Sequence, residues 1–203
     1  QEAVLSMLAV SELGDTYTCI GVDADQHHVI NHLTGEEMNE TRNVLVESAR
    51  IARGNVKDLK DITPADFDGL AIPGGFGAAK NLTHWAFSGP EGDINPEVRR
   101  IINETLHADK PIAAMCMGPT VVAKALEGTG IKSRLTVGTT EAPSPYDIKA
   151  VSGGMEVAGA VAEMVTVAHV TKDSVNKIVT TPCYMMEASI GEINEGIQQA
   201  VKQ

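Results

Sequence analysis

The sequence is poor in aromatic residues, in cysteine and in positive charge. Aromatic residues make up 3% of its 203 residues, so aliphatic side chains and methionine must fill the interior. The three cysteines, Cys19, Cys116 and Cys183, are far apart and lack metal-ligand spacing, which favours free thiols in a reducing compartment. The sequence has 16 Lys and Arg but 27 Asp and Glu. The resulting net charge of −11 argues against nucleic acid or an anionic membrane as a partner.

Long apolar runs are absent as well. No run approaches the roughly 20 residues that a membrane helix needs, and no signal peptide is visible. The apolar content of 43% is ordinary for a globular chain, and 203 residues suffice for one core. We therefore expect a single domain over residues 1–203, in the cytoplasm or, in a eukaryote, in the mitochondrial matrix.

Short apolar stretches alternate with stretches of helical spacing along the chain. We expect helices over residues 1–13, 40–53, 95–108, 120–127, 155–162 and 185–201, and strands over 17–22, 68–73, 112–115, 134–138, 165–170 and 177–182. The second helix is predicted to be capped by Asn39 or Thr41 and to end at Gly54. This alternation predicts an α/β fold with a mainly parallel sheet.

The stretch around Cys116 carries the strongest chemical signal. The strand predicted over residues 112–115 is followed at once by a helix that ends at Gly128, so Cys116 lies where a strand becomes a helix. Backbone N–H groups are unpaired at such a point and the helix dipole favours an anion, so the thiol should ionise more easily than usual. Cys116 is therefore a candidate nucleophile. The alternative is that it is a small buried hydrophobic residue.

A glycine-rich segment, Gly74–Asn81, follows another predicted strand. It lacks the dinucleotide fingerprint, because Lys80 stands where the third Gly or Ala belongs, and it lacks the Gly-Lys-Ser/Thr ending of a phosphate loop. It can still offer backbone N–H groups to an anion or oxyanion. Ligands of parallel sheets bind at the carboxyl ends of strands, so this segment and Cys116 are predicted to share a pocket. The alternative is a tight turn without a ligand.

Four stretches together resemble the ElbB glyoxalase-like proteins, of the PfpI and parkinsonism-associated deglycase branch of the class I glutamine amidotransferase-like superfamily. They are Arg42–Gly54, Pro73–Leu82, Ala114–Pro119 and Val179–Pro182. The resemblance covers essentially the whole chain. It implies a flavodoxin-like three-layer sandwich, a homodimer, a nucleophilic cysteine and a carboxylic acid from the first helix that hydrogen-bonds the thiol.

On this resemblance the acid is Glu2. A carboxyl group held beside a thiolate in an apolar site should stay protonated and can give or take a proton. The alternative for Glu2 is an ordinary acidic residue in the first turn of a helix. The oxyanion is expected on the backbone N–H groups of Gly75 and Met117, with Gly74 and Phe76 beside the substrate.

The chain departs from many relatives in lacking a histidine near the cysteine. Met117 follows Cys116 where many relatives have His, and Thr139 and Thr140 stand where others have one. A Cys-His-Glu arrangement for amide cleavage is therefore unsupported, because nothing delivers a proton to the leaving amine. A Cys-Glu pair suited to carbonyl addition remains.

The resemblance also bears on the start of the chain. Relatives have a strand in the middle of the sheet before the helix that carries Glu2, whereas this sequence begins at the helix. A gap in the middle of a sheet would leave buried backbone groups unpaired at a high free-energy cost. We expect an upstream strand outside these 203 residues, so that the domain is N-terminally incomplete.

The histidines offer a competing metal-site interpretation. His28 and His32 are four residues apart, as helical zinc ligands are, but Asn31 and Gly35 favour a loop, and no metal site is predicted. His84 is a candidate pocket residue together with Asn81 of the glycine-rich segment. Its alternative is surface packing of a helix.

These features predict a cofactor-independent enzyme that converts glyoxal or related 2-oxoaldehydes to 2-hydroxy acids. Cys116 would add to the aldehyde to form a hemithioacetal, and Glu2 would act as acid and base. Early adducts of such aldehydes with protein amines are further candidate substrates. The expected partners are the aldehyde and a second copy of the chain. The alternative is a non-catalytic protein that senses oxidants through the same thiol.

Overall fold

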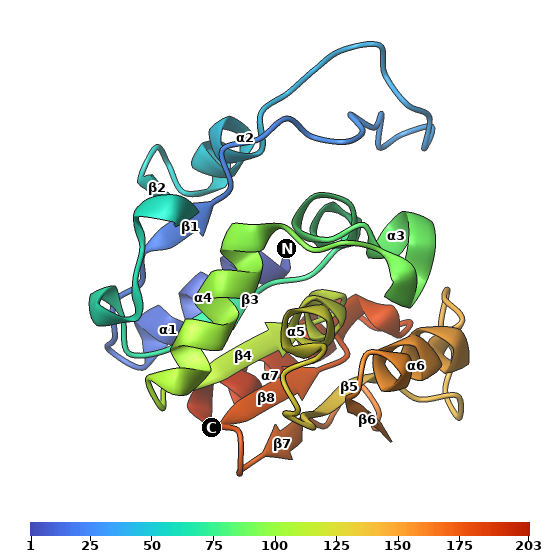
Figure 1. The fold of residues 1–203 in the computed structure, drawn as a ribbon. Coiled ribbons are helices and arrows are strands. Elements are labelled where there is room, and N and C mark those ends of the chain that lie inside the picture. The colour runs from blue at the N-terminus through green and yellow to red at the C-terminus, as the bar shows by residue number, and fades with distance from the viewer.

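The computed structural model describes residues 1–203 as a layered α/β fold (Figure 1). Its central sheet has the strand order β3 (Leu70–Ile72), β4 (Ile112–Met115), β8 (Ile178–Thr181), β7 (Thr171–Asp173). Pairs β3–β4 and β4–β8 are parallel, and only the edge strand β7 runs antiparallel to β8. The predicted α/β class with a mainly parallel sheet is confirmed.

Two further parallel strand pairs flank this sheet. Strand β1 (Cys19–Gly21) pairs with β2 (Val56–Asp58), and β5 (Arg134–Gly138) pairs with β6 (Val161–Met164). Side chains tie β5 to the central sheet, because the Thr136 N–H donates to Thr180 Oγ1 at 2.9 Å. The strand predicted over residues 134–138 is therefore correct in its bounds.

The helices cover both faces of the central sheet (Figure 1). Helices α1 (Glu2–Glu12) and α7 (Ile190–Lys202) pack against each other on one face, and α4 (Pro96–His107) and α5 (Gly118–Leu126) lie on the other. The remaining helices are α2 (Val44–Ile51), α3 (Trp85–Ser88) and α6 (Ile148–Val157). None of the helices has the length and apolar content that crossing a bilayer requires.

Several predicted boundaries are wrong, each for a local reason. Helix α2 is capped by Asn43, whose side chain accepts from the Val46 N–H at 3.0 Å, rather than by Asn39 or Thr41. Helix α7 begins later than predicted, at Ile190, because Ser189 and Glu192 form a capping box there. Strand β2 was not predicted, since three residues with an exposed lysine give too short a pattern.

The largest error concerns residues 139–170. The helix predicted over residues 155–162 is displaced: the structure has helix α6 over Ile148–Val157, mostly before the predicted range, and strand β6 over Val161–Met164 begins where the predicted helix ends. Gly153 and Gly154 discouraged a helix at this point. Gly154 is needed there because a side chain would come within 2.8 Å of the Trp85 ring. The strand predicted over 165–170 is replaced by the short β7 at Thr171–Asp173.

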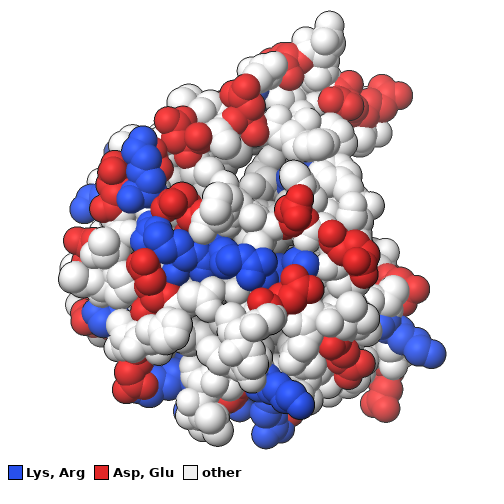
Figure 2. Space-filling model, in the orientation of Figure 1, with Lys and Arg blue, Asp and Glu red and all other residues white.

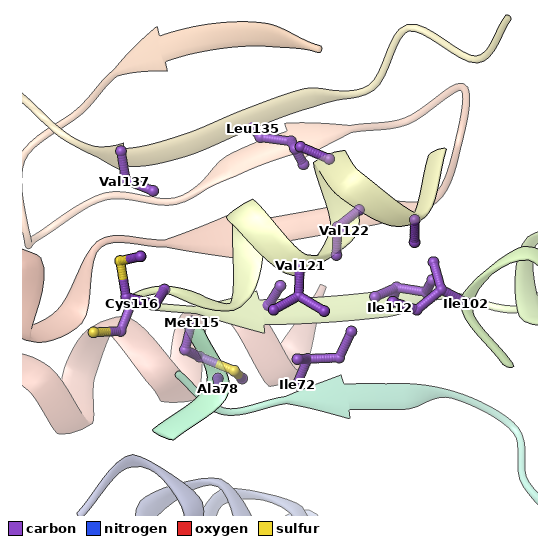
Figure 3. Close-up of a cluster of buried hydrophobic side chains, with 14 of the residues drawn as sticks. Ile72, Ala78, Ile102, Ile112, Met115, Cys116, Val121, Val122, Leu135 and Val137 are labelled. Atoms are coloured by element: carbon purple, nitrogen blue, oxygen red, sulfur yellow. The ribbon is translucent and has the colours of Figure 1, made fainter. Parts of the chain in front are cut away.

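The hydrophobic core lies around helix α5, every residue of which is buried. Figure 3 shows Val121 and Val122 of this helix among Ile112 of β4, Ile72 of β3 and Leu135 of β5. Close packing on all sides allows the helix no alternative position. The turn that leads from β4 into α5 is therefore held rigidly, and this turn carries Cys116.

Basic side chains gather in a band across the face shown in Figure 2, with acidic groups along it. One basic side chain of the protein, Arg100, has a defined structural role. The Arg100 guanidinium donates to the carbonyls of Leu59 and Ile62 at 3.0 and 3.1 Å and pairs with Glu97 and Glu104. Its donors are thus engaged within the fold.

Candidate active site

Cys116 occupies the turn between β4 and α5, as the sequence predicts. Its φ of +56° lies in the left-handed region, which a residue with a side chain seldom adopts without tertiary support. The Cys116 N–H supplies that support by donating to the Thr181 carbonyl at 3.1 Å, one step beyond the β4–β8 pairing. Cys116 is 5% exposed as a residue, so the turn that carries it is almost entirely buried.

The glycine-rich segment lies directly against this turn. A Cβ on Gly74 would be 2.5 Å from the Met117 nitrogen and 2.6 Å from the Cys116 Cβ, so only glycine fits. A Cβ on Gly118 would be 2.5 Å from the Ile72 carbonyl oxygen, at the end of β3. The predicted neighbourhood of the glycine-rich segment and Cys116 is therefore confirmed by close backbone approach.

Two backbone N–H groups point at the Cys116 sulfur. They belong to Gly75, whose φ is +96°, and to Met117 at the start of α5, and hydrogen bonds from both lower the pKa of the thiol. The left-handed backbone of Gly75 turns its N–H back toward the sulfur. Two converging donors can also hold a negative oxygen that develops on an atom bonded to this sulfur.

Glu2 provides a carboxyl group at the same place. It begins helix α1, is 7% exposed, and shares a hydrogen bond with the Cys116 thiol. Two contacts fix this end of the helix: the Tyr184 hydroxyl donates to the Gln1 side chain, and the Tyr184 backbone N–H to the Glu2 carboxylate. Residues 114 positions apart in the sequence thus form a pair because α1 packs on the sheet beside the turn after β8.

Burial raises the pKa of the Glu2 carboxyl above its ordinary value of 4.5, although the hydrogen bond with Cys116 opposes the shift. A raised pKa suits a group that both takes and gives a proton near neutral pH. Because Glu2 is buried, the alternative interpretation of an ordinary solvated acid in the first turn of a helix is wrong.

The expectation that Cys116 ionises easily is wrong. Burial and then the negative charge of Glu2 raise the pKa of the thiol to about 12, and these effects exceed the opposing hydrogen bonds from Gly75 and Met117. The physical reason is that the turn is far less solvated than an isolated helix N-terminus. The resting form is therefore a neutral thiol that donates to the Glu2 carboxylate, and attack requires Glu2 to remove the proton.

An aromatic pair lies near the site. The ring of Phe76, which is 48% exposed, meets the ring of Tyr146 edge-on with centroids 5.6 Å apart. Burial and then the charges of Cys116 and Glu2 raise the pKa of the Tyr146 hydroxyl.

Tyr146 was not predicted as a site residue. It belongs to the loop after β5, and Ser144 fixes this loop by donating from Oγ to the Met185 carbonyl at 2.6 Å. The available signal was its place after the carboxyl end of a predicted parallel strand.

Comparison with known proteins places this arrangement in a family. Residues 46–137 match the model of the DJ-1/PfpI family. The ES1 protein homolog, mitochondrial, of Rattus norvegicus is 39% identical over 210 residues, which cover 99% of this chain and 75% of the relative. The chain belongs to the DJ-1/PfpI family.

Two further relatives support the assignment of this chain to the DJ-1/PfpI family. Glutamine amidotransferase-like class 1 domain-containing protein 3, mitochondrial, of Homo sapiens is 39% identical over 206 residues, covering 99% of this chain and 74% of the relative. A solved isoprenoid biosynthesis protein with an amidotransferase-like domain from Ehrlichia chaffeensis aligns with a TM-score of 0.88 and 35% identity, over 99% of this chain and 87% of that chain. The protein is thus class I glutamine amidotransferase-like, and the expected flavodoxin-like fold is confirmed.

In this DJ-1/PfpI protein, His84 and Asn81 contact the loop between β1 and α2. We call this loop, residues 23–43, the insertion segment. Asn81 accepts from the His27 N–H at 2.8 Å and donates to the Gly77 carbonyl at 2.9 Å. The His84 and His27 rings lie 6.2 Å apart, and Phe87 packs between the same groups. Both residues therefore hold the insertion segment, and neither hydrogen-bonds to Cys116 or Glu2.

The histidines of the insertion segment lie in a loop, as predicted. The His28 ring lies 3.2 Å from the Lys80 ammonium and 3.8 Å from the Glu37 carboxylate. No group of three or more His, Cys, Asp or Glu side chains in the structure could hold a metal ion. Histidine side chains hydrogen-bond to Lys80 and Thr166 and not to Cys116.

Proposed function

We propose that the protein is an ElbB-type member of its family that converts glyoxal or a related 2-oxoaldehyde to the 2-hydroxy acid without a cofactor. The observation that carries the proposal is the hydrogen-bonded pair of Glu2 and Cys116, buried beneath two converging backbone N–H groups. The DJ-1/PfpI family includes glyoxalase and deglycase enzymes, which agrees with this chemistry.

The first step is addition of the thiol to the aldehyde carbon. The Glu2 carboxylate takes the thiol proton as the carbon–sulfur bond forms, and the carbonyl π electrons move to oxygen. The N–H groups of Gly75 and Met117 stabilise this oxyanion, which takes the proton from Glu2 to give the hemithioacetal and returns Glu2 to its carboxylate form. The raised pKa of the Cys116 thiol makes Glu2 indispensable here, since almost no free thiolate is present at neutral pH.

The later steps move one proton between adjacent carbons. Glu2 removes the proton from the sulfur-bearing carbon to give an enediol, and the neighbouring carbon is then protonated, which leaves a thioester of the 2-hydroxy acid. Water cleaves the thioester and regenerates the thiol. Glyoxal plus one water thus becomes glycolate, with no oxidant or reductant.

The near-complete burial of Cys116 favours small substrates. The residue is 5% exposed, and Tyr146, whose ring meets that of Phe76, lies near it, so a two- or three-carbon aldehyde fits better than a large one. Early aldehyde adducts on protein amines are secondary candidate substrates. Amide cleavage is not proposed, because no histidine reaches Cys116 to protonate a leaving amine.

The test is product analysis with purified protein and a panel of small aldehydes. Wild type should release glycolate from glyoxal, Cys116→Ala should show only the uncatalysed rate, and Cys19→Ala should match wild type because Cys19 contacts Met7 away from the site. Equal turnover by wild type and Cys116→Ala would refute the mechanism.

We also propose that the protein forms homodimers and works in the cytoplasm or, in a eukaryote, in the mitochondrial matrix. The names of two relatives include the word mitochondrial, which supports the latter compartment. Sedimentation analysis at micromolar concentration tests the dimer, and a monomer over that range would contradict it.

A further inference from the structure

A second cysteine stands beside the proposed nucleophile. Strands β4 and β8 pair with Met115 opposite Thr181, and the Cys116 N–H continues the pairing to the Thr181 carbonyl. Paired strands lie about 4.8 Å apart. The chain beyond β8 turns at Pro182 into the short helix Cys183–Met185, so the two cysteine-bearing turns leave the sheet side by side.

The Cys183 residue follows closely on this pairing. Continued by one residue, the register that pairs Met115 with Thr181 puts Cys116 opposite Pro182, the residue next to Cys183. Cys183 is fully buried, at 0% exposure. A disulfide requires Cα atoms about 4.4–6.8 Å apart, so the proposal requires the two turns to bring Cys116 and Cys183 within that range. The third cysteine, Cys19, lies 3.5 Å from the Met7 sulfur and is only half-buried.

We propose that Cys183 is the resolving thiol for Cys116, so that a hydroperoxide converts the active site into a reversible Cys116–Cys183 disulfide. This inference rests on the proposed function only in taking Cys116 as the reactive thiol. The bond would block aldehyde turnover while it persists and would protect Cys116 from irreversible oxidation.

The chemistry proceeds in two balanced steps. The Glu2 carboxylate takes the Cys116 proton as the sulfur attacks the peroxide oxygen, the O–O bond breaks, and the leaving oxygen takes that proton from Glu2 and departs as water or an alcohol, which leaves Cys116 as a sulfenic acid. Cys183 then attacks the Cys116 sulfur, the S–S bond forms, the S–O bond breaks, and the hydroxide leaves as water with the Cys183 proton. A dithiol reductant returns both thiols by exchange.

The surroundings divide the roles of the two thiols. Burial first, and then the charges of Glu2 and Cys116, raise the pKa of Cys183, so this thiol stays protonated and does not compete for the substrate. Cys116 keeps 5% exposure whereas Cys183 has none, so an incoming peroxide meets Cys116 first. The Glu2 carboxyl can deliver a proton to the leaving hydroxide because it hydrogen-bonds Cys116.

The experiment treats the full chain with a small excess of hydrogen peroxide and maps its peptides without reduction. We expect a peptide that links Cys116 to Cys183, a loss of two hydrogen atoms from the intact mass, and release of both thiols by dithiothreitol. The same link should form in Cys19→Ala. A link that involves Cys19, or sulfinic acid at Cys116 without any link, would overturn the proposal.

A second measurement follows recovery after oxidation, using either aldehyde turnover or the titre of free thiol at Cys116. In Cys183→Ala, and in the near-isosteric Cys183→Ser, Cys116 should proceed to sulfinic acid, and the thiol recovered with dithiothreitol should be about tenfold lower than in Cys19→Ala. Equal recovery in all variants would refute the inference.

The two proposals fail in different ways. A Cys116–Cys183 link in a protein that turns over no aldehyde would leave this inference intact and remove the glyoxalase proposal. Turnover that depends on Cys116, with no link to Cys183, would do the reverse. The link itself is measured in the wild-type chain, so the result does not depend on the folding of a variant.

Discussion

The Cys116 turn and the insertion segment with its following helix α2 represent two extremes of packing. All of α5 after the turn is buried, whereas α2 has no buried residue and exposes Val46 to 63%. The insertion segment is still more open: Leu33 is 97% exposed, and Figure 1 shows the loop between β1 and α2 extending away from the rest of the fold. Rigid packing is thus concentrated where the chemistry requires fixed geometry, and the region above it is held by few contacts.

The largest effect we expect is kinetic and concerns Glu2. In Glu2→Gln the thiol loses its proton acceptor, so kcat/KM for glyoxal should fall by about 10²- to 10⁴-fold. Wild-type kcat/KM should rise with pH through the raised pKa of Glu2, above 4.5, as the carboxylate forms. Steady-state rates from pH 4 to 9 check this. Retention of the same rising limb in Glu2→Gln would assign it to another group.

A change in the rigid region should cost far more than a matched change nearby. Gly74→Ala places a Cβ 2.5 Å from the Met117 nitrogen, and we expect a loss of about 1–3 kcal/mol in the free energy of unfolding. Gly77→Ala is the control: its φ of −57° suits alanine and its nearest neighbour would be Asn81 at 4.0 Å. Urea denaturation compares the two, and equal stabilities would contradict the close approach described above.

The two helices offer a direct comparison of packing. Val121→Ala in α5 removes two methyl groups from a fully buried side chain, which should lower the free energy of unfolding by about 2 kcal/mol. Val46→Ala in α2 removes the same atoms from an exposed one and should change it by less than about 0.5 kcal/mol. The midpoints of urea denaturation of the two variants and of wild type measure these two losses. Similar losses at both sites would mean that α2 is packed in solution.

The smallest effect is a pH-dependent change in stability. Because the folded pKa of Glu2 lies above its unfolded value, near 4.5, Glu2 stabilises the fold below that pH, and this contribution is lost as pH rises through the folded pKa. Wild type should therefore lose stability relative to Glu2→Gln over this interval, since glutamine does not titrate. Thermal midpoints at pH 4.5 and 7.5 measure the difference. A constant difference would indicate that the Glu2 carboxyl is solvated.

Much of the fold followed from local pattern. The strand over Ile112–Met115 and the helix that begins with Asn95 and Pro96 occur where the sequence predicts them, because an uninterrupted apolar run and a capping residue are strong local signals. Helix α6 was missed because its glycines oppose a helix locally, while Trp85 requires Gly154 through a contact distant in sequence.

The candidate site was predictable in part. The turn that carries Cys116 and its contact with Gly74 follow from where parallel strands end. Glu2 was reached only through resemblance to a family, since an acid in a first helical turn is common. Tyr146 was not predicted as a site residue and Cys183 was treated only as a free thiol, whereas in the folded chain the charge of Cys116 contributes to the raised pKa of both.

The sequence by itself determined the α/β alternation and the position of Cys116 at a turn, because these depend on side-chain periodicity and capping over a few residues. Tertiary structure alone decided the state of the thiol. Its pKa depends on how far water is excluded and on how near the Glu2 carboxylate lies. Both quantities arise from packing between segments distant in the chain, and no local pattern encodes them.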